Sequence, residues 1–202
     1  MLSDSTESPD AIMLRSQKLH DMTFGDNLKA IGRAGAGVNN IPVDKLTELG
    51  VPVFNAPGAN ANAVKELVIA SLFVAQRNLY DAIAYTRSLE TTGDALDKEV
   101  ESGKKKFVGR ELPGRTLGVV GLGAIGVEVA NAAAALGMNV IAFDPGVTID
   151  NAWRLNRDVV KASGIDEMIV NSDFITVHVP LLDATRNMIC LLYTSPSPRD
   201  RG

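Results

Sequence analysis

The sequence predicts an α/β fold built from parallel sheets, and two observations carry this prediction. Short apolar runs alternate with segments of helical periodicity along most of the chain, a pattern typical of β-α-β units whose strands run parallel. One of the apolar runs leads directly into glycines with Gly-x-Gly-x-x-Gly spacing, at Gly121, Gly123 and Gly126. A strand, a glycine turn and a helix in this order begin such a unit.

The three glycines predict a phosphate-binding turn. Gly121 permits a sharp change from strand to helix, Gly123 lets the backbone approach a phosphate without an intervening Cβ, and Gly126 lets the helix pack close to the strand. The N-terminus of that helix then directs backbone N–H groups toward a pyrophosphate. We therefore expect a dinucleotide at this turn, the alternative being a glycine-rich turn that binds nothing.

The residues after the turn complete the predicted unit. Helical spacing of apolar residues continues to Gly137, a typical C-terminal glycine, and Asn139–Phe143 has the composition of a second buried strand. Asp144 follows that strand, 23 residues after Gly121, close to the roughly 20 residues expected for an acid that binds the adenosine ribose. A carboxylate there would repel a 2′-phosphate, so the sequence favours NAD over NADP.

The first part of the chain predicts further β-α-β units. The expected strands are residues 11–14, 28–31 and 51–54. A short helix is expected from Pro42 to about Leu49, and a long one through Val64 and Ala75, with Asn60 or Asn62 as its cap. Residues 91–113 are polar and predict a short helix and loop.

Composition narrows the classes of partner. The chain has 202 residues, 46% of them hydrophobic and 22% charged, and a formal net charge of −4. This balance gives no positive excess for binding nucleic acid. Cys190 is the single cysteine, so it forms no internal disulfide and has no metal-ligand companions, and we expect no metal. No basic and apolar leader or long apolar run is present, so we expect no membrane partner and a cytoplasmic location.

Four segments carry a resemblance to a known family. They are Leu28–Ile41, Asn55–Leu67, Gly121–Gly126 and Thr176–Leu181. Together they resemble the D-isomer-specific 2-hydroxyacid dehydrogenases, over about residues 10–189. The resemblance implies a partial flavodoxin-like substrate domain in residues 1–90, a linker in 91–113 and a partial Rossmann-like NAD-binding domain in 114–190, with the active site in the cleft between the domains.

The resemblance also implies an activity. The chain is most similar to family members that oxidise 3-phosphoglycerate to 3-phosphohydroxypyruvate by hydride transfer to NAD, at the start of serine biosynthesis. It implies a homodimer or higher homo-oligomer, formed by the helix from Val64 and the segment after it. Two alternatives remain: a non-catalytic NAD sensor like the family's corepressor relatives, and a dehydrogenase for another 2-hydroxy acid such as glycerate or lactate. A phosphate-binding loop at Arg15 and Ser16 would be without purpose in a sensor of NAD alone.

Substrate-binding residues are assigned by the resemblance. Arg15 and Ser16 match the loop that meets the phosphate end of the substrate, and a guanidinium and a hydroxyl suit phosphate oxygens. Arg33 resembles a second substrate-facing arginine. Ala36 and Gly37 match the loop whose N–H groups meet the substrate carboxylate. The alternative for both arginines is surface ion pairing.

The same resemblance assigns further cofactor-binding residues. Ala124 and Ile125 match backbone positions against the pyrophosphate. Val179 and Pro180 match the wall of the adenine pocket. His178 follows a strand beside the cofactor, and this position in the family performs no proton transfer.

The family's catalytic arginine, glutamate and histidine have no match in this chain. We therefore assign no catalytic residue and expect an inactive fragment, because hydride transfer needs a base for the hydroxyl proton and a cation beside the developing carbonyl. The opening unit of the substrate domain and the last strands of the NAD-binding domain also lack a match. Residues 191–202 depart from the family pattern, and we expect them to be a disordered, non-native tail.

Overall fold

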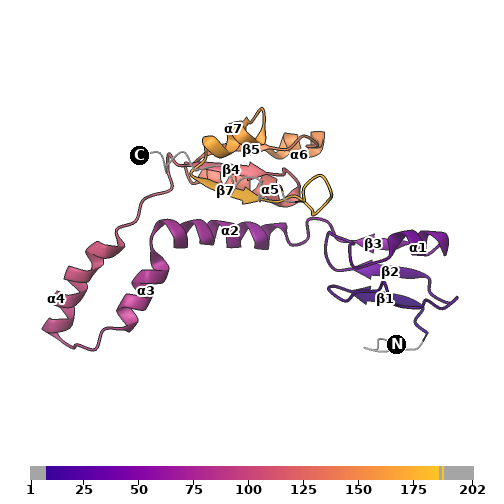
Figure 1. Cartoon of the computed structure of the whole chain (residues 1–202), viewed down its shortest axis with the longest axis horizontal. Helices are drawn as coiled ribbons and strands as arrows, with labels where there is room; N and C mark the ends of the chain where they lie inside the picture. Colours follow the sequence, from indigo (N-terminus) through magenta and orange to yellow (C-terminus); the bar gives the residue numbers. More distant parts are fainter. Residues whose placement is uncertain (1–7, 187, 189–202) are drawn as a thin grey trace. The chain divides into compact units, whose positions relative to one another are not determined.

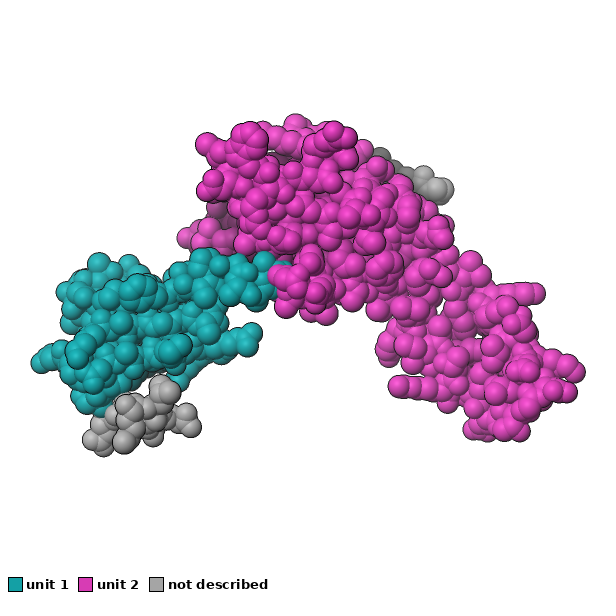
Figure 2. Space-filling view, turned by 180° about the vertical axis from the view of Figure 1, so that it is seen from behind, with its two compact units in different colours: residues 1–61 teal, residues 62–202 magenta. Residues whose placement is uncertain are grey.

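The computed structural model describes residues 8–186 and 188 and contains two parallel sheets (Figure 1). This confirms the predicted α/β fold. The chain divides into two compact units, residues 1–61 (unit 1) and 62–202 (unit 2), which Figure 2 shows in teal and magenta. The predicted disordered tail at 191–202 lies outside the described residues. The predicted domain limits at residues 90, 113 and 190 remain a prediction.

Unit 1 is a three-stranded sheet covered by α1 (Val43–Glu48) and by loops. Its strands are β1 (Ala11–Leu14), β2 (Ala30–Arg33) and β3 (Val53–Asn55), in the order β1-β2-β3. The core of the unit consists of seven buried aliphatic residues: Leu14, Leu19, Leu28, Ile31, Ile41, Leu46 and Val51. Because all three strands run parallel, their carboxyl ends lie at one edge of the sheet.

Strand β2 lies two residues later than the sequence predicted. Leu28 is buried, but its N–H donates to the Gly25 carbonyl at 3.1 Å in a turn before the strand. The ladder pairs Leu14 of β1 with Arg33, so Arg33 is the last residue of β2 rather than part of the following loop. Strand β3 is shifted in the same direction, beginning at Val53 after Pro52, which has no N–H to donate.

Unit 2 contains a four-stranded parallel sheet in the order β6-β5-β4-β7. The strands are β4 (Thr116–Val120), β5 (Asn139–Phe143), β6 (Val159–Lys161) and β7 (Phe174–Val177). Strand β5 has the predicted limits. In this order β5 lies on one side of β4 and β7 lies on the other, so the strand order reverses at β4. Ligands of open α/β sheets bind at such a point of reversal.

Helices cover both faces of this sheet (Figure 1). Helix α5 (Ala124–Ala135) packs on the face that contains Leu117 and Val119, and α6 (Ile149–Arg154) lies beside α5. Helix α7 (Ile165–Val170) covers the opposite face. Strand β4 is therefore buried from both sides, which explains why the run before the glycine turn is almost continuously apolar.

The long predicted helix is α2 (Ala61–Gln76). Val68, Ile69 and Leu72 pack against the core under α5. Asn62 lies inside the helix, where its side-chain amide donates to Glu66 Oε1 at 2.8 Å, so of the two suggested caps only Asn60 directly precedes the helix. No single helix of the described residues is long and apolar enough to span a membrane, although α2 and the next helix pass that test as a pair bent by 65°.

Beyond α2 the chain forms a pair of neighbouring helices, α3 (Leu79–Arg87) and α4 (Asp94–Gly103), followed by a 3₁₀ turn at Lys104–Phe107 (Figure 1). The Tyr85 ring joins them, because its centroid lies 5.2 Å from that of Phe107 and its hydroxyl donates to the Glu99 carbonyl at 2.8 Å. We call α3, α4 and this turn the helical arm.

Gly103 makes this packing possible, since a Cβ at this position would overlap the Tyr85 ring and hydroxyl. We expect Gly103→Ala to separate α3 from α4 and to cost about 1–3 kcal/mol of local stability, as overpacking does. Hydrogen exchange of the arm's amides measures this. Lys98→Ala, at an exposed position of the same helix, is the control and should exchange like wild type. Unchanged protection in Gly103→Ala would contradict the proposed packing.

Candidate functional site

The turn between β4 and α5 requires glycine at its first position. Gly121 has φ +88°, a left-handed conformation that side chains disfavour. A Cβ there would also lie 2.7 Å from Val179 Cγ1 and 2.8 Å from the His178 carbonyl oxygen. The residues that follow β7 lie so close to this turn that no side chain fits at its first position.

The other two glycines differ in what surrounds them. A Cβ on Gly126 would overlap the Gly121 carbonyl oxygen, so α5 could not lie this close to the turn. A Cβ on Gly123 would meet nothing within 4 Å, and Gly123 has φ −72°. Gly121 and Gly126 are therefore required by the fold, whereas the open face at Gly123, the residue that precedes α5, is free for a ligand.

Asp144 ties this turn to the end of β5. Its Oδ2 accepts a hydrogen bond from the Leu122 N–H at 2.7 Å, and its Oδ1 accepts one from the Gly146 N–H at 2.8 Å. Each carboxylate oxygen can accept a second hydrogen bond. The half-buried carboxylate thus fixes the turn and retains capacity for hydroxyl donors of a ligand.

The residues after β7 complete this group. The His178 N–H donates to the Val120 carbonyl at 2.7 Å, and its Nε2 lies 2.9 Å from Thr176 Oγ1. Burial lowers the pKa of the His178 imidazole, which favours its neutral form. Pro180 is exposed. The structure therefore brings the predicted residues of three strand ends together.

Ala124 and Ile125 occupy the first turn of α5, and both are half-buried. Ile125 packs against the core under the helix. Their backbone N–H groups belong to the first turn, where a helix leaves its N–H groups without intrahelical partners. An anion at this end would also meet the positive end of the helix dipole.

The predicted substrate residues gather at the strand ends of unit 1. Arg33 Nε donates to Asn40 Oδ1 at 3.0 Å. A Cβ on Gly35 would lie 2.5 Å from Arg33 Nη1, and one on Gly37 would lie 3.9 Å from the same atom. The guanidinium therefore extends along the Gly35–Gly37 segment. Ala36 is exposed, and its carbonyl accepts from Asn55 Nδ2 at 2.7 Å.

Arg15 and Ser16 follow β1 directly and are exposed. Within the described part of the chain, neither Arg15 nor Arg33 forms an ion pair. Surface ion pairing, the alternative considered for both arginines, finds no partner there. These residues belong to unit 1 and the glycine turn belongs to unit 2, and the predicted cleft between domains remains a prediction.

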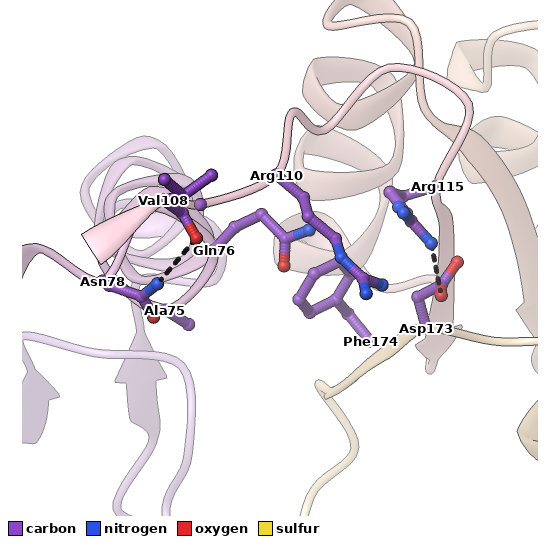
Figure 3. Close-up of a pocket in the computed structure, with 9 residues that line it drawn as sticks. Ala75, Gln76, Asn78, Val108, Arg110, Arg115, Asp173 and Phe174 are labelled. Atoms are coloured by element: carbon purple, nitrogen blue, oxygen red, sulfur yellow. Dashed lines mark hydrogen bonds and ion pairs between the residues drawn. The ribbon is translucent and has the colours of Figure 1, made fainter. Parts of the chain in front are cut away.

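A cavity of about 250 Å³ lies elsewhere in unit 2 (Figure 3). Arg115 and Asp173 line it, with 3.5 Å between Nη1 and Oδ1, and the Thr116 N–H donates to Asp173 Oδ2 at 2.9 Å. Arg115 and Asp173 directly precede β4 and β7, so the cavity is at the amino ends of these strands. The glycine turn is at their carboxyl ends, and none of the predicted site residues lines the cavity.

The comparison with protein families decides the relationship. A family model described as "D-isomer specific 2-hydroxyacid dehydrogenase, NAD binding domain" matches residues 76–191, more than half of the chain. The chain belongs to this family. The match covers the glycine turn, Asp144 and the residues after β7, and it confirms NAD as the cofactor of this domain.

Curated relatives of this chain give more detail. It is 41% identical over 186 residues to the D-3-phosphoglycerate dehydrogenase of Archaeoglobus fulgidus, a match that covers 89% of this chain and 32% of that protein. It is 42% identical over 166 residues to the hydroxypyruvate reductase of Thermotoga maritima, covering 82% of this chain and 48% of the relative. The matches thus span 32% and 48% of the length of these two relatives.

Solved structures of the family agree with the fold. The NAD⁺-bound 3-phosphoglycerate dehydrogenase of Entamoeba histolytica has a TM-score of 0.63 at 29% identity, over 87% of this chain and 48% of that one. The Aquifex aeolicus D-lactate dehydrogenase complexed with NAD and lactic acid has a TM-score of 0.68 at 26% identity, over 89% and 51%.

The surroundings of the glycines predict separable effects of substitution. Gly126→Ala forces α5 away from the Gly121 carbonyl and should lower the stability of unit 2 by about 1–3 kcal/mol. Gly123→Ala meets no atoms of the chain and should unfold like wild type, yet bind NAD at least about tenfold more weakly because its methyl group occupies the phosphate approach.

Denaturant unfolding and calorimetric titration with NAD measure the two effects. Gly123→Ala, which should keep wild-type stability, shows whether a loss of affinity occurs without a loss of folding. Equal stability of wild type and Gly126→Ala, or full NAD affinity in Gly123→Ala, would contradict the roles assigned to these glycines.

Proposed function

We propose that this chain is part of an NAD-dependent dehydrogenase that oxidises 3-phosphoglycerate to 3-phosphohydroxypyruvate in the intact protein. One observation carries the proposal: the same chain holds a dinucleotide turn with an open face at Gly123 and a pair of arginines without ion-pair partners, among the described residues, at Arg15 and Arg33. The first suits NAD, and the second suits a substrate with two anionic ends.

Different cofactor residues bind different parts of the dinucleotide. The N-terminus of α5, with Gly123, Ala124 and Ile125, receives the pyrophosphate. Asp144 accepts from the adenosine ribose hydroxyls with the lone pairs that Leu122 and Gly146 leave unused. Val179 and Pro180 form one wall of the adenine pocket. The neutral His178 ring, directly after β7, lies next to this wall in the sequence.

Different substrate residues bind the two anionic ends of the acid. Arg33 and the N–H groups of Ala36 and Gly37 receive the carboxylate, and Arg15 with Ser16 receives the phosphate. A guanidinium fork matches both anions in a bidentate manner, which orients the substrate as well as binding it. Bound NAD would supply the hydride acceptor for the carbon that bears the hydroxyl group.

We assign no catalytic residue to this chain. Removal of the hydroxyl proton requires a base, and the developing carbonyl requires a cation beside it. His178 is unsuited to the first role, because its Nε2 already lies within hydrogen-bond distance of Thr176. We therefore expect the chain alone to bind NAD without turnover. Residues 1–90 would supply part of the substrate domain and 114–190 part of the NAD-binding domain, joined by 91–113.

A second candidate follows from the Thermotoga maritima relative, whose name indicates reduction of hydroxypyruvate. In that case the substrate would be a 2-hydroxy acid without phosphate. The exposed loop at Arg15 and Ser16 favours the phosphorylated acid, and it also weighs against a sensor of NAD alone.

We further propose that the intact protein is a cytoplasmic homodimer or higher oligomer that pairs through the helical arm. Helix α3 exposes Leu79, Tyr80 and Ile83, and exposed apolar residues of this size commonly mark an interface.

Asp144→Ala should change the affinities for NAD and NADP by different amounts. Loss of the ribose acceptor should weaken NAD binding by about tenfold, whereas NADP, which the carboxylate repels, should lose little or gain. Parallel calorimetric titrations with NAD and NADP measure the ratio, in which any general loosening of the turn cancels. Equal losses for both cofactors would remove the basis for NAD selectivity.

Arg15→Ala should separate the two candidate substrates. We expect binding of 3-phosphoglycerate to weaken by about tenfold or more, and binding of glycerate, which lacks the phosphate, to stay unchanged. Lys18→Ala, an exposed cation in the same loop, is the matched control. If Arg15→Ala leaves the affinity for 3-phosphoglycerate intact, the phosphorylated substrate is not supported.

A further inference from the structure

Asn40 is the one buried polar residue among those described, with 6% of its surface exposed. It belongs to the loop that follows β2 and contacts the loop that follows β1. Its Oδ1 accepts from Arg33 Nε at 3.0 Å, and its Nδ2 donates to the Gln17 carbonyl at 2.7 Å. Its own carbonyl accepts from the Leu19 N–H at 2.9 Å. Both ends of its side chain are therefore engaged with elements that carry predicted substrate residues.

The first of these bonds fixes the Arg33 side chain. With Nε bound to Asn40, the guanidinium plane cannot rotate freely, and the four N–H donors on its Nη atoms stay available. Nη1 lies along Gly35, where even a Cβ would be only 2.5 Å away. Glycine at position 35 and Asn40 thus act together, one leaving the space and the other holding the guanidinium in it.

The second bond fixes the loop after β1. The Gln17 carbonyl is anchored directly beyond Arg15 and Ser16, and the longer contact of Asn40 Nδ2 with the Arg15 carbonyl, 3.4 Å, joins the same loop. Because β1 and β2 pair in parallel with Leu14 opposite Arg33, both loops leave the same edge of the sheet. One amide therefore connects them.

We propose that Asn40 is a positioning residue that pre-orients Arg33 and the Arg15–Gln17 loop for the anionic groups of the substrate. This inference rests on the proposed function, in which these arginines bind a phosphorylated 2-hydroxy acid. An amide fits the position because it supplies one acceptor for Arg33 and a donor for a carbonyl. A carboxylate would keep the acceptor and face the Gln17 carbonyl without a donor, and an apolar side chain would leave these partners unsatisfied in a buried site.

The test compares Asn40→Ala with Asn39→Ala, an exposed neighbour, in the 202-residue chain. The exchange rate of the Arg33 Nε–H with water, followed by nuclear magnetic resonance without any ligand, reports the first bond. We expect it to accelerate in Asn40→Ala and to stay slow in Asn39→Ala. Asn40→Asp retains the acceptor and should keep the slow exchange, which provides a second variant if Asn40→Ala does not fold.

Titration with 3-phosphoglycerate supplies the second readout. We expect Asn40→Ala to bind roughly tenfold more weakly than wild type, a change that corresponds to about 1.4 kcal/mol. In an Arg33→Ala background the same substitution should have a smaller effect, because only the contribution through the Arg15–Gln17 loop then remains.

The outcomes distinguish a failure of the Asn40 inference from a failure of the proposed substrate site. If Arg33→Ala weakens binding and Asn40→Ala does not, the inference is wrong and the proposed function stands. If Asn40→Ala weakens binding equally with and without Arg33, or leaves Arg33 Nε–H exchange slow, its role is only structural. If Arg33→Ala leaves 3-phosphoglycerate binding unchanged, the proposed substrate site is wrong, and the inference fails with it.

Discussion

The cofactor end of the structure depends on the contact between Gly126 and the Gly121 carbonyl. Only a residue without a Cβ lets α5 begin so close to the end of β4, and this places the free N–H groups of the helix beside the open face at Gly123. Gly121 can turn there because His178 and Val179 close around it from β7. Asp144 then holds the turn through Leu122. One close backbone approach thus sets the geometry of three strand ends.

The candidate sites of the two units lie at equivalent positions of their sheets but consist of different chemical groups. Both present ligand groups where parallel strands end and glycines follow. Unit 2 offers backbone N–H groups and one carboxylate, which suit a dinucleotide with its ribose hydroxyls. Unit 1 offers the Arg33 guanidinium, held by Asn40 over Gly35, which suits a small acid. A hydroxyacid dehydrogenase requires both kinds of site. The family match covers residues 76–191 and therefore the glycine turn of unit 2, and the acid-binding site of unit 1 is our proposal.

Much of this was predictable from the sequence, because β5, α5 and the glycine turn have strong local signals. The start of β2 was not, since buried Leu28 packs from a turn yet has the composition of a strand residue. Helices α6 and α7 and strand β6 are too short, at six, six and three residues, for periodicity to reveal them. Asn40 was missed because its importance lies in contacts across 7 and 23 residues of sequence, although its place after the glycine-rich segment was a usable signal.

The most direct test is calorimetric titration of the purified 202-residue chain with NAD and with ADP-ribose, with 3-phosphoglycerate oxidation assayed in the same preparation. Because Gly121–Gly126 and Asp144 all belong to the β4-α5-β5 unit, we predict that both ligands bind with similar affinity and that no turnover occurs. A folded chain that binds neither ligand would contradict the assignment of the glycine turn. Measurable turnover would contradict the proposal that no residue of this chain acts as the base.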